Sequence, residues 1–301
     1  TGVQTCALPI WGPCRFGYYA QVERDILEDL GYQFEMIVLE APDSRLYDLT
    51  QQVKALGQNV SWWEAIQAIR YAWAKLNAVE LVERQFDYHL PRAWDKDKIE
   101  KIYDRAVLDI DKASSKEEVR EVAHEAIRTM QLAELKPGTP LKIGLVGEIY
   151  TLLEPASNYE ICRLIGRMGV EVSRSIYLTE WINDHLLGGL GKKSNHEDLC
   201  WQAKPYLGHR VGGHGLETVG HAVNFARLGY DGVIQVGPLT CMPEIVAQAI
   251  LPSVSAHEGV PAMTLWFDEL SGTAGVVTRL EAFIDMVHRR QAFSEQHCRE
   301  A

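Results

Sequence analysis

The sequence predicts an α/β protein whose C-terminal half, residues 139–290, is an open parallel sheet of the Rossmann or flavodoxin type. Short, continuously apolar segments alternate there with amphipathic helical segments, which is typical of a parallel sheet covered on both faces. A breaker, Lys136–Pro140, separates this lobe from a stretch of almost purely helical periodicity. The 301 residues are 47% hydrophobic and 24% charged, so a sizeable core is available.

The first 42 residues divide into two parts. Thr1–Ile10 (TGVQTCALPI) resembles a translated sequencing-adapter tail, and we interpret it as an artefactual scar outside the fold. Residues 11–42 hold a loop, a helix over Ala20–Leu30 and an apolar strand over Phe34–Leu39. We interpret them as the remnant of a truncated N-terminal α/β lobe.

Residues 43–138 form a helical region. Ser61 caps a long helix, and two amphipathic helices follow over Lys96–Ala113 and Ser115–Leu135. Ser115 and Glu118 have the spacing of a capping box. Three tryptophans of the first helix are expected in the core of this bundle: Trp62, Trp63 and Trp73.

The C-terminal lobe, residues 139–290, has four predicted strands. They are Lys142–Gly147, Val170–Ile176, Asp231–Val236 and Ala262–Phe267. The predicted helices between and after them are Asn158–Met168, Thr179–Leu187, Glu197–Leu207, Gly215–Leu228, Pro243–Val254 and Gly275–Arg289. A polar tail, residues 291–301, completes the chain.

Charge and cysteine content narrow the classes of function. A net charge of −11 and a pI near 5.4 argue against binding to nucleic acid or to an anionic membrane. No apolar run approaches the ~20 residues that span a bilayer. The cysteines after the scar are scattered and lack a CxxC pair, which favours a reducing cytoplasm over a disulfide framework.

Polar residues follow the predicted strands at the edge where open α/β sheets bind their ligands. Glu148 and Glu154 follow the first strand and Glu244 the third, so these carboxylates are weak candidates for proton transfer, together with His214 in a GGHG turn. Glu244 is equally explained as a favourable charge in the first turn of its helix. A solvated residue at a helix start is the more ordinary interpretation of His214.

Cys241 is the residue of the lobe whose position most favours chemical reactivity. It lies between a Gly-Pro turn and a helix start, where the helix dipole favours thiolate, the form that binds metals. Cys14 follows Gly12-Pro13 in the same way. Two separate thiolates suit an iron–sulfur cluster better than structural zinc, which prefers closely spaced ligand pairs. Each cysteine alone is equally explained as a packing residue, and Cys162 and Cys200 are interpreted as core filling.

Three segments carry a family resemblance: Gly12–Tyr32, Gly147–Ile161 and Val236–Met286. They resemble the 2-hydroxyacyl-CoA dehydratase superfamily, in the branch of CoA-substrate-specific enzyme activase-related proteins near the double-cubane cluster proteins. The resemblance implies two α/β lobes, a helical region and an iron–sulfur cluster, [4Fe–4S] or double-cubane, between the lobes. Cys241 matches the cysteine before the family's MPE motif and Cys14 the ligand of the preceding lobe. A further ligand is expected upstream, lost by truncation.

The resemblance also implies a function in anaerobic electron transfer. The chain would accept an electron from an ATP-dependent activase, separate or fused, for reductive dehydration of an acyl-CoA, and would act as a homo- or heterodimer. The sequence has no phosphate-binding motif of that ATPase, so it is interpreted as the electron-receiving component, a lyase or reductase. Two alternatives stay open: a double-cubane-type, ATP-coupled reductase of small molecules, and a non-catalytic electron-transfer or binding module.

Overall fold

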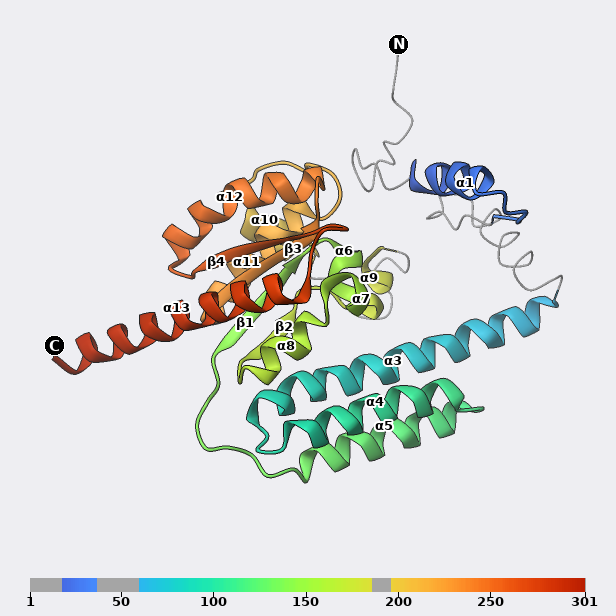
Figure 1. Ribbon diagram of the computed structural model, residues 1–301, viewed down its shortest axis with the longest axis horizontal. Helices are drawn as coiled ribbons and strands as arrows, with labels where there is room; N and C mark the ends of the chain where they lie inside the picture. The colour runs from blue at the N-terminus through green and yellow to red at the C-terminus, as the bar shows by residue number, and fades with distance from the viewer. Residues whose placement is uncertain (1–17, 37–59, 186–195, 301) are drawn as a thin grey trace, which may run out of the picture.

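The computed structural model describes residues 18–36, 60–185 and 196–300 (Figure 1). Its centre is a four-stranded sheet built from β1 (Lys142–Gly147), β2 (Glu171–Arg174), β3 (Gly232–Pro238) and β4 (Ala262–Phe267). All neighbouring strands are parallel, and their order is β2-β1-β3-β4. The prediction of an α/β fold with a parallel sheet is therefore confirmed.

The sheet is buried by helices on both faces, as the continuously apolar strands require. One face packs on α8 (Ile161–Arg167) and α13 (Thr273–Glu300), and Leu145 and Leu280 are fully buried there. The other face packs on α11 (Gly215–Arg227) and α12 (Met242–Glu258), with α10 (His196–Ala203) outside α11. Figure 1 shows these helices above and below the sheet.

The connection from β1 to β2 differs from the predicted single helix over Asn158–Met168. The chain forms α6 (Ile149–Leu153) and α7 (Pro155–Asn158), and then breaks at Tyr159 and Glu160 before α8. Both residues adopt left-handed backbone conformations, with φ of 58° and 54°. The Tyr159 hydroxyl donates to the carbonyl of Ser271, 2.6 Å away, so a tertiary contact secures the break.

The described part of the helical region is a three-helix bundle of α3 (Trp62–Arg92), α4 (Lys96–Lys112) and α5 (Lys116–Gln131). Ser61 caps α3 with a full capping box, because Ser61 Oγ accepts from Glu64 N and the Glu64 carboxylate accepts from Ser61 N. The box predicted at Ser115 is only half formed. Ser115 Oγ accepts from Glu118 N, but the Glu118 carboxylate accepts from Ser114.

The bundle core does not include all of the tryptophans expected there. Trp62 and Trp63 are 44% and 66% exposed, and Trp73 is half-buried. The prediction for Trp62 and Trp63 is wrong because the buried core of the bundle begins further along α3, at Ala78. The later part of α3 also contacts α8, β2 and α9 (Leu178–His185), so the bundle lies against the β2 edge of the sheet.

The remaining described elements add little to the core. Helix α1 (Tyr19–Asp29) buries none of its residues. Of the strand predicted over Phe34–Leu39, the described part, Phe34–Met36, has no strand pairing, and the rest lies outside the described residues. In the parts of the chain that the structure describes, no helix is both long and apolar enough to cross a membrane.

Candidate functional site

Cys241 lies beyond the carboxyl ends of β1 and β3, at the start of α12; we call this side of the sheet the sheet edge. Strand β3 ends at Pro238, and Thr240 then takes a left-handed conformation with φ of 69°. The backbone N–H of Cys241 donates to the carbonyl of Pro238 at 3.1 Å, which closes the turn and makes Cys241 the N-cap of α12. Its half-buried thiol therefore lies at the positive end of a 17-residue helix, a position that favours thiolate.

Glu244 lies one turn into α12 and is fully buried. Its carboxylate accepts from Thr218 Oγ1 of α11, at 3.0 and 3.1 Å, and from Gln235 Nε2 of β3, at 2.8 Å. Gln235 Oε1 in turn accepts from Thr264 Oγ1 of β4 at 2.9 Å. These four side chains form the strand-end cluster, which ties the start of α12 to α11 and to two strands.

Burial raises the pKa of Glu244 to about 7, although the hydrogen bonds from Gln235 and Thr218 act to lower it. The nearby charges of Glu148 and Glu217 contribute to the rise. Glu244 is thus in the first helical turn, as expected, but it is not a surface charge. Because no part of it faces solvent, its geometry suits the positioning of Cys241 rather than contact with a substrate.

Glu148 and Glu154 cap the short helices that follow β1. Glu148 Oε1 and Oε2 accept from the N–H groups of Tyr150 and Thr151, at 3.0 and 2.9 Å, and Glu154 Oε1 accepts from Ala156 at 3.1 Å. The N–H of Glu148 donates to the carbonyl of Val236, which places Glu148 beside β3 and at the same edge as Cys241. The structure therefore brings Glu148, Cys241 and Glu244 to one edge of the sheet.

His214 is the N-cap of α11, where its ring Nε2 accepts from Trp181 Nε1 of α9 at 3.2 Å. The GGHG turn packs against the start of α12. A Cβ atom on Gly215 would lie 2.4 Å from the carbonyl oxygen of Pro243, so glycine is required for this approach. This packing gives the turn a structural role that the sequence motif alone did not suggest.

Two other cysteine side chains lie within the described residues, those of Cys162 and Cys200. Cys14 is outside the described residues, and so is the side chain of Cys298. Cys162 of α8 packs against the sheet core, and burial raises its pKa, with a further contribution from Asp87. Among the cysteine side chains that the structure describes, Cys241 alone lies at the carboxyl end of a strand.

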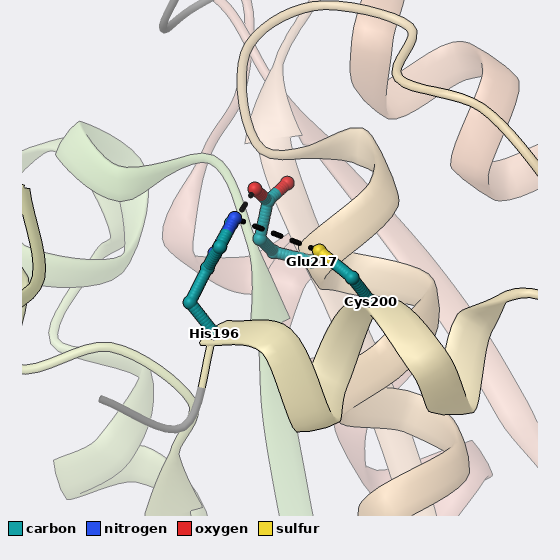
Figure 2. Close-up of side chains that lie close together, drawn as sticks. All are labelled: His196, Cys200 and Glu217. Atoms are coloured by element: carbon teal, nitrogen blue, oxygen red, sulfur yellow. Dashed lines mark hydrogen bonds and ion pairs between the residues drawn. The ribbon is translucent and has the colours of Figure 1, made fainter. Parts of the chain in front are cut away.

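Cys200 belongs to a second cluster that sequence reasoning missed. His196 and Cys200 lie four residues apart on α10, and both point toward Glu217 in the first turn of α11 (Figure 2). Cys200 Sγ is 3.5 Å from His196 Nε2, and Glu217 Oε1 is 3.6 Å from His196 Nδ1. The His-x-x-x-Cys spacing is visible in the sequence, but the third member depends on how α10 packs on α11.

A third polar cluster lies between the bundle and the sheet. The guanidinium of Arg174, at the end of β2, pairs with Glu83 of α3, and Tyr103 of α4 donates to Glu83 at 3.3 Å. Asp87 of α3 is buried beside them, and its burial raises its pKa to about 7 despite the charge of Arg174. Asp87 Oδ2 and Arg174 Nε have no hydrogen-bond partner. We call Glu83, Asp87, Tyr103 and Arg174 the interlobe cluster.

No protein-family model matches this chain, and no curated protein matches it either. Whether an iron–sulfur cluster fits this chain depends on the thiol groups at the sheet edge. Cys241 offers the sulfur ligand that such clusters use, at a helix start that stabilises negative charge. The described edge thus fits one ligand of a cluster, with Glu244 buried directly behind it.

Proposed function

We propose that this chain is the cluster-bearing component of a system like the 2-hydroxyacyl-CoA dehydratases, with Cys241 as a ligand to an iron–sulfur cluster. The observation that carries the proposal is the position of Cys241, a half-buried thiol at the N-terminus of α12 and beyond the carboxyl end of β3. The family resemblance around the CMPE run at Cys241–Glu244 supports the same assignment.

The sheet topology supports this location for the site. The order β2-β1-β3-β4 agrees with the flavodoxin-like arrangement, so we assign the lobe to that type. In such sheets the connections after β1 and after β3 lead to opposite faces, and ligands bind in the crevice between the ends of these two strands. Here that crevice lies at the ends of β1 and β3, where Glu148 and Cys241 are found.

Each residue at the edge has a distinct task in this proposal. Cys241 binds iron through its thiolate, and Glu244 holds the first turn of α12 in place through Thr218 and Gln235. When bound, the cluster supplies one-electron chemistry, with an electron from an ATP-dependent activase used to remove a hydroxyl group from an acyl-CoA. Cys14 is the proposed ligand from the other lobe. The proposal places the protein in a reducing cytoplasm, where thiolates stay available.

The first test measures iron in the whole chain. The protein is produced and reconstituted anaerobically, and iron, acid-labile sulfide and the electron paramagnetic resonance of the reduced sample are determined. We expect bound iron and sulfide in the parent chain and a loss of most of both in Cys241→Ser. Cys162→Ser is the matched control, because Cys162 lies in the sheet core, and it should keep its iron. Iron no higher than background in the parent chain would end the proposal.

A second measurement separates the dehydratase from the reductase alternative. Protein that holds the cluster is combined with ATP and an activase of this class, and is offered either 2-hydroxyacyl-CoA esters or small unsaturated molecules. Loss of water from the ester supports a dehydratase, whereas reduction of small molecules alone replaces it with the ATP-coupled reductase. Turnover of neither, with iron bound, indicates an electron-transfer module.

A further inference from the structure

The cluster of His196, Cys200 and Glu217 has the composition of a metal site. One ring nitrogen, the Cys200 sulfur and one carboxylate oxygen lie within 4.8 Å of one another. The thiol and the carboxylate both point toward the imidazole ring from two different helices (Figure 2). Nitrogen, sulfur and oxygen ligands of these three kinds are those that Zn²⁺ uses in proteins.

The separations are close to those of a tetrahedral ion. Bonds of about 2.0–2.3 Å at tetrahedral angles place ligand atoms roughly 3.3–3.6 Å apart. The 3.5 Å between Cys200 Sγ and His196 Nε2 already falls in that range. The ligand atoms of the group all lie within 4.8 Å of one another, so the widest separation must shorten by about 1 Å to reach a tetrahedral distance.

The two helices hold these side chains at a fixed distance. Helix α10 packs so closely on α11 that a Cβ atom on Gly220 would lie 2.5 Å from the carbonyl oxygen of Leu199. Leu199 directly precedes Cys200, and Gly220 is three residues after Glu217, so this contact lies beside the cluster. His196 and Glu217 keep only 22% and 14% of their side chains exposed, which limits competition from solvent.

We infer that His196, Cys200 and Glu217 bind a divalent cation of the zinc class that links α10 to α11. Three protein ligands leave the fourth tetrahedral position for a water molecule. The guanidinium of Arg210 is the group that a cation must displace, because its Nη2 lies 2.8 Å from His196 Nε2. This site is separate from the proposed iron–sulfur function and shares no ligand with it.

The test uses Zn²⁺ and Co²⁺ on the whole chain. Protein stripped with a chelator is titrated with Zn²⁺ against a chromophoric competitor, and Co²⁺ is added to a second sample to record absorption. We expect one Zn²⁺ per chain, and cobalt bands with thiolate-to-metal charge transfer. Cys200→Ser should abolish the charge-transfer band, and Glu217→Gln should weaken Zn²⁺ binding by at least about tenfold. Cys162→Ser is the matched cysteine control, because Cys162 packs against the sheet core and belongs to neither proposed site, and it should leave both readouts unchanged.

Arg210→Gln tests the site with a variant whose expected effect cannot result from misfolding. Removal of a positive charge beside the imidazole should tighten Zn²⁺ binding by roughly three- to tenfold, and a folding defect cannot do this. The inference is wrong if the stripped chain takes up no Zn²⁺, or if the cobalt charge-transfer band survives Cys200→Ser. The two proposals fail separately, because Cys200→Ser should keep its iron and Cys241→Ser its zinc.

Discussion

The strand-end cluster and the interlobe cluster each bury a carboxyl group next to a cysteine, yet their hydrogen bonding differs. Glu244 accepts hydrogen bonds from Thr218 and Gln235, and its cysteine neighbour Cys241 reaches the sheet edge. Asp87 has an oxygen without a partner, and the cysteine nearby, Cys162, is half-buried and packs against the sheet core. Both carboxyl groups have pKa values raised to about 7 by burial.

The strand-end cluster therefore has one fixed geometry, whereas the interlobe cluster contains buried groups that lower the folding stability. A buried network in which every acceptor is used fixes one geometry, and that suits the support of the proposed ligand, Cys241. The interlobe cluster instead keeps buried charges with incomplete hydrogen bonding, so its stability depends on the pairing between Arg174 and the carboxylates of α3. Three predictions follow from this contrast, in order of expected size.

The largest effect is expected from Arg174→Met. The Arg174 side chain is only 7% exposed, and its loss removes the ion-pair partner of half-buried Glu83 and a stabilising positive charge beside buried Asp87. We expect the free energy of unfolding, measured with urea, to fall by about 3–5 kcal/mol. Arg105→Met is the control, because Arg105 is 72% exposed and pairs with Asp109 on the surface of α4, where about 0–1 kcal/mol is expected. Equal losses in both variants would contradict this account.

The second prediction concerns pH. In the folded chain both carboxyl groups have a pKa of about 7, above the ordinary 3.8 of Asp and 4.5 of Glu, so folding favours their protonated forms. Each contribution to stability is therefore complete below about pH 4 and is lost as the pH rises to about 7, by at most roughly 3–4 kcal/mol per group.

Asp87→Asn and Glu244→Gln should each flatten this decline when unfolding is measured between pH 5 and pH 8. At pH 5 the two variants should differ. Glu244→Gln places an amide opposite the donors Gln235 and Thr218, and should cost about 1 kcal/mol more than Asp87→Asn. An unchanged decline in either variant would show that its carboxyl group is already ionised in the folded chain across this range.

The smallest effect, on reactivity rather than stability, compares Cys162 with Cys241. Both cysteines are half-buried, but burial raises the pKa of the Cys162 thiol, whereas Cys241 lies at a helix start, where the helix dipole favours thiolate. We expect iodoacetamide to modify Cys241 at least about tenfold faster at pH 7.5, as followed by peptide mass spectrometry of the iron-free chain. Similar rates of modification at Cys162 and Cys241 would show that the two thiols do not differ in reactivity.

The strands were the most predictable part of the fold. The bounds of β1 and β4 agree with the predicted Lys142–Gly147 and Ala262–Phe267, because each is a continuous apolar run between breakers. The break at Tyr159 and Glu160 was not predictable, since it depends on a hydrogen bond to Ser271, more than a hundred residues away. The exposure of Trp62 likewise depends on where the bundle ends, which local periodicity does not encode.

The candidate site was predictable only in part. The Gly-Pro pair before a helix start identified Cys241, although Gly237 and Pro238 end β3 and the turn itself lies at Leu239 and Thr240. The burial of Glu244 depends on Thr218 and Gln235, which come from two other elements. The cluster of His196, Cys200 and Glu217 likewise needs α10 to pack on α11. The burial of Glu244 and the cluster at Cys200 were therefore not predicted, because both depend on contacts between segments that are distant in the sequence.

The parallel topology also sets the order in which the chain can fold during synthesis. Helices α3, α4 and α5 follow one another through short connections, so the bundle can form as soon as they leave the ribosome. Strand β1 must wait, because its central partner β3 begins at Gly232, 89 residues after Ile143, with which it pairs. Cys241 follows β3, so its final environment is assembled only late in synthesis, after the helices and strands that precede it.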